Sequence, residues 1–421
     1  MDINTFFKKQ NTKNQVKILT CGSVDDGKST LIGRLLFDSK SIYSDQLSQT
    51  KFESEKYGTQ GKEIDLALLI DGLQAEREQG ITIDVAYRFF STDNRKFIVA
   101  DSPGHEQYTR NMVTAASNAE MAIILVDARN GIMPQTKRHS FIANLVGIKN
   151  IIVAINKMDL VNYDKQIFKK IVQNYKDNVL SKLNFQNIEF IPVSALAGDN
   201  IVTNSENMNW YSGRPLMTLL ETLSIKDEIN ESFSLPIQYV NRPNLDFRGF
   251  CGTVSTGSIK TGDKIKVSSS EQEAKISKIF IGDLNVSHCS AGDAVTIILD
   301  KEIDISRGDV LLGNQSRAEK NKAFLSNLIW FSENKGFSNR SYLLKSANNQ
   351  VGCEIVKIKN KINVNNFEKV NAGSLSMNDI AECELLIDND SLMLPYKLNP
   401  TLGNFILIDK QTNLKIGRAH V

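Results

Sequence analysis

Short apolar runs alternate with segments of helical spacing through the first half of the chain. The apolar runs lie at residues 16–21, 97–100, 121–126, 150–155 and 188–193. Apolar residues recur with helical spacing at residues 29–37, 107–118, 135–146, 164–182 and 214–225. Buried strands that alternate with helices are typical of a parallel sheet covered on both faces. We therefore predict an α/β domain built on a mostly parallel sheet, with helices on both faces.

The pattern changes near residue 233, where short β-rich segments separated by Gly, Asp and Ser begin. The first set includes residues 235–240, 252–257, 263–267, 294–299 and 309–313, and the second includes residues 327–331, 341–345 and 404–409. Turn residues at this spacing favour small β-barrels. The polar stretch at residues 316–322 is the candidate boundary between the two barrels. The predicted domains are residues 1–228, 229–316 and 317–421.

Length and charge agree with this division and narrow the range of partners. The chain has 421 residues, which is more than one hydrophobic core accommodates and fits two or three domains. Its formal net charge is only +2, so no strong net field favours a nucleic-acid partner. We therefore expect no nucleic-acid partner.

Cysteine usage and the N-terminal residues favour a cytoplasmic protein. The five cysteines include no C-x-x-C pair, and their odd number argues against a disulfide framework or a zinc site. Residues 1–15 hold no apolar run typical of a signal peptide. The apolar runs elsewhere are far shorter than the ~18 residues of a membrane span. We expect a cytoplasmic chain that has no membrane partner.

Residues 22–30, GSVDDGKST, fit the phosphate-binding pattern G-x-x-x-x-G-K-[ST]. Gly22 and Gly27 would let the backbone pass close to phosphates, and the N-terminus of the following helix would point its N–H groups at the anion. Lys28 is expected to reach the β- and γ-phosphates, and Ser29 to supply a hydroxyl to Mg²⁺. The alternative is a Gly-rich turn without a ligand. The position between an apolar strand and a helix favours a nucleotide-binding loop.

Two further segments fit the switches of a nucleotide-hydrolysing site. DSPGH, residues 101–105, follows an apolar strand, so Asp101 can hold the Mg²⁺ shell and the Gly104 N–H can meet the γ-phosphate. Thr82, within GITID, is the expected second Mg²⁺ ligand and would be ordered only when the γ-phosphate is present. The long polar segment from about residue 38 to 80 is predicted to be a mobile first switch, with a plain surface insertion as the alternative.

The last two motifs select the base. In NKMD, Asp159 can accept both from N1–H and from the 2-amino group of guanine, a pair of donors that adenine does not present. Asn156 can bond the 6-oxo and N7 edge and tie loops together, and the Lys157 stem can cover the ring. SAL, residues 194–196, follows the next strand and offers the Ala195 N–H to the 6-oxo group. The predicted ligands are therefore GTP and Mg²⁺, bound at the carboxyl ends of the strands.

His105 follows the switch glycine and is the candidate for orienting the attacking water, with a structural or solvent-facing histidine as the alternative. For His139, His288 and His420 a surface or packing role is the default. The predicted catalytic residues are His105, Lys28 and Thr82, and the predicted metal ligands are Ser29, Thr82 and Asp101. The predicted GTP-binding residues are Gly22, Ser23, Val24, Asp25, Asp26, Gly27, Lys28, Ser29, Thr30, Asp101, Ser102, Pro103, Gly104, His105, Asn156, Lys157, Met158, Asp159, Ser194, Ala195 and Leu196.

These motifs in this order, followed by two β-barrels, resemble the translation-factor superfamily of GTPases along the whole chain. Within this superfamily, the sequence pattern at residues 70–84 is shared by eukaryotic-type elongation factors and by the large subunit of bacterial sulfate adenylyltransferase. The chain resembles the sulfate adenylyltransferase subunit more closely at residues 22–40, 84–92, 213–221, 238–263 and 403–413. The resemblance is weakest at residues 331–345. Asp26 stands where elongation factors usually carry His, and a near-neutral chain fits tRNA binding poorly.

This resemblance implies a regulatory GTPase subunit. Its partner would be a smaller catalytic subunit that makes adenylyl sulfate and pyrophosphate from ATP and sulfate, in a heterodimer or a higher assembly. GTP hydrolysis would drive this uphill reaction through a conformational cycle. Some relatives carry a fused adenylyl-sulfate kinase domain, but the sequence holds no second phosphate loop, so kinase activity is not expected.

Two other functions stay open at this point. One is a translation elongation or release-type factor, which would bind ribosomes and tRNA. The other is a nucleotide-binding scaffold that does not hydrolyse GTP. The intact Lys28, Thr82 and His105 argue against the scaffold.

Overall fold

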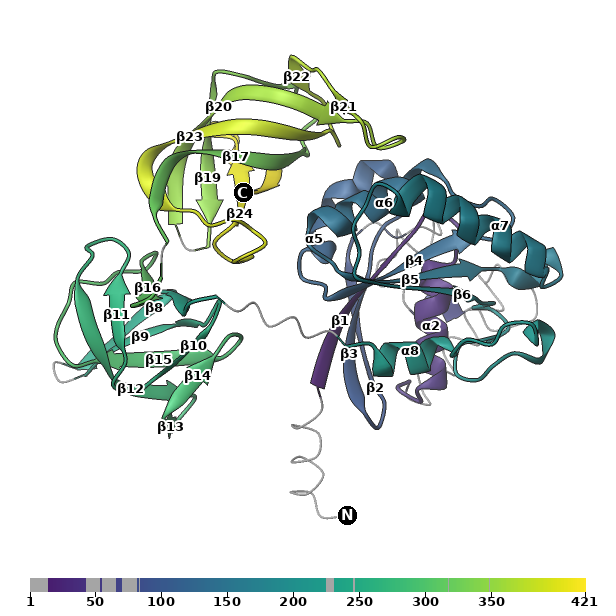
Figure 1. Cartoon of the computed structure of the whole chain (residues 1–421), viewed down its shortest axis with the longest axis horizontal. Helices are drawn as coiled ribbons and strands as arrows, with labels where there is room; N and C mark the ends of the chain where they lie inside the picture. Colours follow the sequence, from purple (N-terminus) through teal and green to yellow (C-terminus); the bar gives the residue numbers. More distant parts are fainter. Residues whose placement is uncertain are drawn as a thin grey trace, which may run out of the picture. The chain divides into compact units, whose positions relative to one another are not determined.

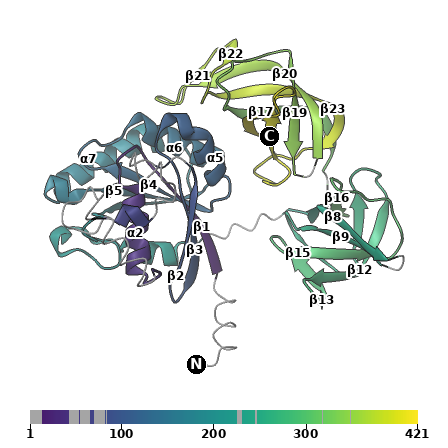
Figure 2. The same ribbon diagram turned by 180° about the vertical axis from the view of Figure 1, so that it is seen from behind.

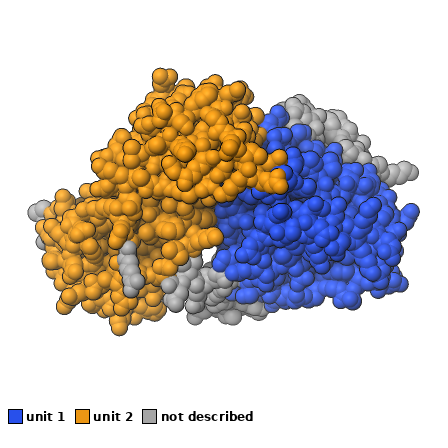
Figure 3. Space-filling model, turned by 45° about the horizontal axis from the view of Figure 1, so that its top comes forward, with its two compact units in different colours: residues 1–226, 364–367 blue, residues 227–363, 368–421 orange. Residues whose placement is uncertain are grey.

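The computed structural model describes residues 14–42, 54, 66–69, 82, 84–224, 231–244, 247–316, 318–347 and 349–421. The chain divides into two compact units, one of residues 1–226 with 364–367 and one of residues 227–363 with 368–421 (Figure 3). Every α-helix that the structure describes lies in the first unit, whereas the described part of the second unit is built from strands (Figure 1).

A six-stranded sheet in the order β2-β3-β1-β4-β5-β6 forms the centre of the first unit. Its strands are β1 (Asn14–Cys21), β2 (Ala86–Ser91), β3 (Arg95–Asp101), β4 (Met121–Asp127), β5 (Asn150–Asn156) and β6 (Asn187–Pro192). All pairings are parallel except that of β2 with β3. The five parallel strands confirm the strands predicted from the apolar runs. The antiparallel edge strand β2 was not predicted.

Helices cover both faces of this sheet, as predicted (Figures 1 and 2). The α-helices are α2 (Lys28–Asp38), α5 (Thr109–Ala116), α6 (Pro134–Leu145), α7 (Lys165–Tyr175) and α8 (Leu216–Thr222). The side chain of Asp164 caps α7 by accepting from the N–H groups of Gln166 and Ile167. The helix predicted over 164–182 ends at Tyr175 and continues as one π-turn, η4 (Lys176–Leu180). The shorter 3₁₀ turns are η1 (Leu66–Leu69), η2 (Glu106–Tyr108), η3 (Met158–Val161) and η5 (Glu206–Met208).

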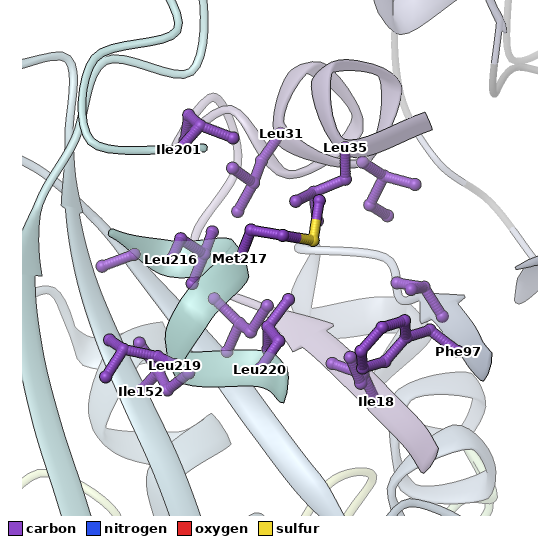
Figure 4. Close-up of a cluster of buried hydrophobic side chains, with 14 of the residues drawn as sticks. Ile18, Leu31, Leu35, Phe97, Ile152, Ile201, Leu216, Met217, Leu219 and Leu220 are labelled. Atoms are coloured by element: carbon purple, nitrogen blue, oxygen red, sulfur yellow. The ribbon is translucent and has the colours of Figure 1, made fainter. Parts of the chain in front are cut away.

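The core on the α2–α8 face holds the start of α2 against the sheet. Leu31 and Leu35 of α2 and Leu219 and Leu220 of α8 are buried together with residues of the central strands, among them Ile18 of β1 (Figure 4). Burial of side chains of this size contributes roughly 1.5–3 kcal/mol each. Because both β1 and α2 are anchored in this way, the loop that joins them is held at both ends.

The second unit contains two sets of strands, each around its own hydrophobic core. The first set pairs in the order β7-β16-β11-β12-β15-β9-β8, with β13 on β12 and a separate β10–β14 pair. These strands are β7 (Ser234–Pro236), β8 (Tyr239–Asn244), β9 (Phe247–Thr253), β10 (Ser258–Lys260), β11 (Lys264–Val267), β12 (Glu273–Ile281), β13 (Leu284–Val286), β14 (His288–Ser290), β15 (Ala294–Leu299) and β16 (Val310–Gly313).

The second set closes into a six-stranded barrel. The strands pair in the order β19-β24-β25-β17-β23-β20, and β20 pairs back onto β19. Its strands are β17 (Lys320–Trp330), β19 (Arg340–Ser346), β20 (Asn349–Ile362), β23 (Ile380–Leu392), β24 (Asn404–Ile408) and β25 (Lys415–His420), with the short strands β18 (Gly336–Phe337), β21 (Lys369–Val370) and β22 (Ser374–Leu375) beside them. Closure leaves this sheet no long unpaired edge.

A small apolar cluster joins the two sets of strands within the second unit. It contains Val310 and Leu312 of β16 and Leu402 of the β23–β24 connection. Beside it, the Asn399 Nδ2 donates to the Ser234 Oγ at 2.9 Å. The polar stretch predicted as a boundary, 316–322, overlaps the start of β17, so its last residues lie in a strand. No helix in the described residues is both long and apolar enough to cross a membrane.

Candidate nucleotide site

The sheet order brings the predicted motifs to one edge. From β1 the chain runs to β2 and β3 on one side of β1, and from β3 it crosses to β4 on the other side. A crevice forms outside the carboxyl ends of the strands where the strand order reverses in this way. The phosphate loop follows β1, DSPGH follows β3, NKMD follows β5 and SAL follows β6. Segments as far apart as residues 22 and 196 are therefore neighbours in the fold.

The phosphate loop is closed by its own polar groups. The Asp26 Oδ2 accepts from the Ser23 N–H at 2.6 Å, and the Lys28 Nζ donates to the carbonyl oxygens of Ser23 at 2.7 Å and Gly22 at 3.3 Å. Gly27 has a φ of 90°, and a Cβ there would lie 2.5 Å from the Asn156 Nδ2, so only glycine fits. The Lys28 ammonium already reaches across the loop, where an anion would offer it stronger acceptors.

Burial shifts the pKa values of Lys28 and Asp26 in this loop. Desolvation lowers the pKa of Lys28, and the Asp101 and Asp26 carboxylates oppose that effect. Desolvation raises the pKa of Asp26 from 3.8 to about 6, although the Lys28 charge opposes the rise. Asp26 therefore stays mostly charged at neutral pH but takes up a proton near pH 6, well above the range of an ordinary Asp.

Three predicted metal ligands lie together beside the loop. The Ser29 Oγ donates to the Asp101 Oδ2 at 3.0 Å and lies 3.5 Å from the Thr82 Oγ1. Two hydroxyls and one carboxylate are hard oxygen ligands that suit Mg²⁺. The described residues contain no group of three or more His, Cys, Asp or Glu that could hold a metal. Most of the predicted first switch, between residues 43 and 81, lies outside the described residues.

The second predicted switch packs directly on the phosphate loop. A Cβ on Gly104 would lie 2.7 Å from the Lys28 Nζ and 2.9 Å from the Val24 nitrogen, so the close approach requires glycine. The Gly104 carbonyl oxygen accepts from the Gln135 Nε2 at 3.2 Å. The His105 and Tyr108 rings pack edge to face, with 6.2 Å between the ring centroids.

The side chains of two motif residues point into the fold. The Ser102 Oγ donates to the Thr20 carbonyl oxygen at 2.7 Å, and Met158 is fully buried. These two side chains support their loops, so Ser102 and Met158 can contact a ligand only through their backbone atoms.

Asn156 joins three loops through one side chain. Its Nδ2 donates to the Asp26 carbonyl oxygen at 2.8 Å, and its Oδ1 accepts from the Ala195 N–H at 2.9 Å. A backbone carbonyl requires the amide nitrogen and a backbone N–H requires the amide oxygen, so the orientation of the side chain is fixed. The predicted loop-tying role of Asn156 matches this geometry. The Ala195 N–H was predicted to point at the guanine 6-oxo group, whereas in the structure it is donated to Asn156.

A cavity of about 210 Å³ lies beside this junction. It is lined by Gly27, Thr30, Arg129, Asn156, Lys157, Asp159, Leu160, Ser194, Ala195 and Leu196. The cavity thus runs from the phosphate loop to the predicted base-recognition residues, with the Asp159 carboxylate on its wall. Its lining combines the Asp159 carboxylate with other polar side chains and with apolar and cationic ones, as expected for a flat polar base.

Four residues beside the site were not assigned to it from sequence. The Arg34 Nε donates to the Ala195 carbonyl oxygen at 3.1 Å and its Nη2 donates to the Leu196 carbonyl oxygen, which ties α2 to the SAL loop. The others are Asp127, Arg129 and His139. Asp127 follows the apolar strand at 121–126, so its position at a strand end was the available signal.

His139 of α6 lies beneath the phosphate loop and is fully buried. Its Nδ1 accepts from the Gly22 N–H at 3.2 Å, so the ring proton resides on Nε2, which has no hydrogen-bond partner among the described residues. Desolvation, helped by the charges of Lys28 and Arg138, lowers the pKa of His139 from 6.5 to about 3. The imidazole is therefore neutral in the folded protein at any pH well above 3. Its Nδ1 is a fixed acceptor for the N–H of Gly22, the first residue of the loop.

The variant His139→Asn should weaken the dependence of stability on pH. Asn keeps an oxygen acceptor for the Gly22 N–H but does not titrate. In the unfolded chain His139 binds a proton below 6.5 and in the folded chain only near 3, so the wild type loses stability as the pH falls between these values. Between about pH 7 and about pH 5 the free energy of unfolding should fall by about 2 kcal/mol more in the wild type than in the variant.

Helical circular dichroism reports this unfolding, because the described α-helices all lie in the first unit. Asp26 has the opposite effect, since its raised pKa makes the folded chain bind more protons below about 6. That contribution is common to both proteins, so their difference reports His139. Equal losses of stability in the two proteins would contradict the buried, neutral histidine.

Comparisons with known proteins agree with a GTP-binding domain followed by β-rich domains. Residues 13–229 match the family model of the elongation factor Tu GTP binding domain, and residues 323–419 match the GTP-eEF1A C-terminal domain-like model. Among solved structures, the Saccharomyces cerevisiae Ski7 GTPase-like domain bound to GTP is similar over 100% of this chain and 99% of its own, with a TM-score of 0.53. At 18% identity, this likeness supports the fold alone.

Curated relatives are similar along the whole chain. Sulfate adenylyltransferase subunit 1 of Psychromonas ingrahamii is 48% identical over 420 residues, which cover 100% of this chain and 89% of that protein. The protein of the same name from Saccharophagus degradans is 50% identical over 421 residues, with the same coverage. The bifunctional enzyme NodQ of Rhizobium sp. (strain N33) is 48% identical, and the match covers 65% of it. The chain belongs to the sulfate adenylyltransferase subunit 1 family, which confirms the family that its sequence resembles.

Proposed function

We propose that this chain hydrolyses GTP and thereby drives the formation of adenylyl sulfate and pyrophosphate from ATP and sulfate on a smaller catalytic partner subunit. The observation that carries the proposal is the junction at Asn156, which places the phosphate loop beside a cavity that carries the Asp159 carboxylate. The names of the full-length relatives supply the reaction. A translation factor, the alternative function, is not favoured by these relatives.

The proposal assigns a role to the residues that would hold the metal, the phosphates and the attacking water. Ser29, Thr82 and Asp101 would hold Mg²⁺, whose charge would offset that of the phosphates. Lys28 would exchange its bonds to the loop carbonyls for bonds to the β- and γ-phosphates. His105, next to Gly104, would orient the attacking water, as a Gln does in other GTPases.

Coupling requires that the GTP and GDP states differ in their contacts with the partner. Gly104 supplies a point where the two states could diverge. It packs within a few ångströms of Lys28, and its carbonyl is held by Gln135. A γ-phosphate that binds Lys28 would also meet the Gly104 N–H, so its loss would release the segment that follows β3.

The chain with its catalytic partner should form adenylyl sulfate from ATP and sulfate at a rate that depends on GTP. The His105→Ala variant should bind GTP normally but hydrolyse it about 100-fold more slowly or worse, and adenylyl sulfate formation should fall to the level measured with GDP. His288→Ala, at an exposed histidine on β14, is the matched control and should behave as the wild type. Adenylyl sulfate formation that is independent of GTP would refute the coupling, and hydrolysis stimulated by ribosomes would favour a translation factor.

The Asp159→Asn variant should change the preferred base from guanine to xanthine. Asn can donate to the 2-oxo group of xanthine, whereas its amide NH₂ would face the 2-amino group of guanine. The ratio of affinities for GTP and XTP, measured by calorimetric titration, should shift toward XTP by about 100-fold or more. Asp93→Asn, in the exposed turn between β2 and β3, is the control and should leave the ratio unchanged. An unshifted ratio in Asp159→Asn would remove Asp159 from base recognition.

A further inference from the structure

Asp127, the last residue of β4, is a buried acid that holds two cations. Its side chain is 1% exposed. The Oδ1 accepts from the backbone N–H of Arg129 at 2.9 Å and from its Nε at 3.1 Å, and the Oδ2 accepts from its Nη2 at 2.6 Å. The Lys157 Nζ lies 3.2 Å from the same Oδ2. Burial alone would raise the pKa of Asp127, but the hydrogen bonds from Arg129 and the charge of Lys157 together lower it.

This arrangement aims both cations at the nucleotide cavity. Arg129 and Lys157 line the cavity together with Gly27 of the phosphate loop and Asp159. Because the cavity runs from Gly27 at the predicted phosphate end to Asp159 at the predicted base end, a cation on its wall can reach the part of a ligand that joins the two ends. In a guanine nucleotide, the part between these two ends is the ribose with its α-phosphate.

The guanidinium has donors to spare for a ligand. Arginine carries five N–H groups, and Asp127 engages its Nε and Nη2. Among the described residues no other hydrogen bond is made by its remaining edge, and the side chain is 47% exposed. A forked bond to a buried carboxylate fixes the plane of the group in advance, so little side-chain entropy is left to lose when a ligand binds.

We propose that Arg129 contacts the bound guanine nucleotide at its ribose and α-phosphate, and that Asp127 is the positioning residue that sets both Arg129 and Lys157. The proposal rests on the proposed function, since it takes a guanine nucleotide as the ligand of the cavity. Asp127 holds Lys157 toward the base and Arg129 toward the sugar, so one carboxylate sets two walls of the site.

Titration of the full chain with GDP and GTP tests the proposal. Arg129→Gln removes the charge and the fork but leaves Asp159 in place. Arg129→Gln should weaken the binding of GDP and of GTP by a similar factor, about tenfold or more, and should leave the preference for guanine over adenine unchanged. Arg129→Lys keeps the charge but cannot bond both Asp127 oxygens and a ligand, so its loss should be intermediate. Arg242→Gln is the matched control, because Arg242 is 46% exposed and also ion-paired, with Glu302.

A double-mutant cycle distinguishes a positioning role of Asp127 from a purely structural role. Asp127→Asn should weaken binding at least as much as Arg129→Gln, because it frees Lys157 as well. The double variant should be little worse than Asp127→Asn alone, which is non-additive behaviour that a general loss of stability does not produce. Affinity of Arg129→Gln within about twofold of the wild type would overturn the proposal. A wild type that binds neither GDP nor GTP would instead refute the proposed function.

Discussion

The site depends on one side-chain amide at the end of a buried strand. Asn156 is 2% exposed, and both of its hydrogen-bonding groups are used by backbone atoms of other loops. Through these two bonds the phosphate loop, the NKMD loop and the SAL loop are held in one arrangement. A buried amide without these partners would cost about 1–3 kcal/mol for each unsatisfied group, so the three loops and the amide stabilise one another.

The parallel sheet makes this junction possible, because it brings the carboxyl ends of β1, β3, β4, β5 and β6 to the same edge. Further polar ties reinforce it from below and from the side. His139 accepts from Gly22 beneath the phosphate loop, Arg34 joins α2 to the SAL loop, and Asp127 sets the cations on the cavity wall. A nucleotide that binds here would meet a site whose donors and acceptors are already oriented, which limits the ordering cost of binding.

The motif residues could be predicted from sequence because each follows a long apolar run, and such runs identify buried parallel strands without tertiary information. The edge strand β2 and the long strands β12, β20 and β23 were not predicted. Their sequences mix Lys, Glu, Asn and Asp into the apolar positions, and their pairing partners lie far along the chain. Arg129 and His139 could not be placed in the site for a similar reason, and for Asp127 the only signal was its position at a strand end. Each lies outside the motifs, and its contact with the site exists only once β4, β5 and α6 have packed.

The affinity of Asn156→Ala for GDP tests most directly the claim that three loops form one guanine-nucleotide site. Ala removes both backbone contacts and the predicted contact with the base, whereas Asn156→Asp keeps the acceptor for the Ala195 N–H. Calorimetric titration should show a loss of at least about 30-fold for Asn156→Ala, with a smaller loss for Asn156→Asp. Wild-type affinity in Asn156→Ala, in a chain that folds normally, would contradict the account.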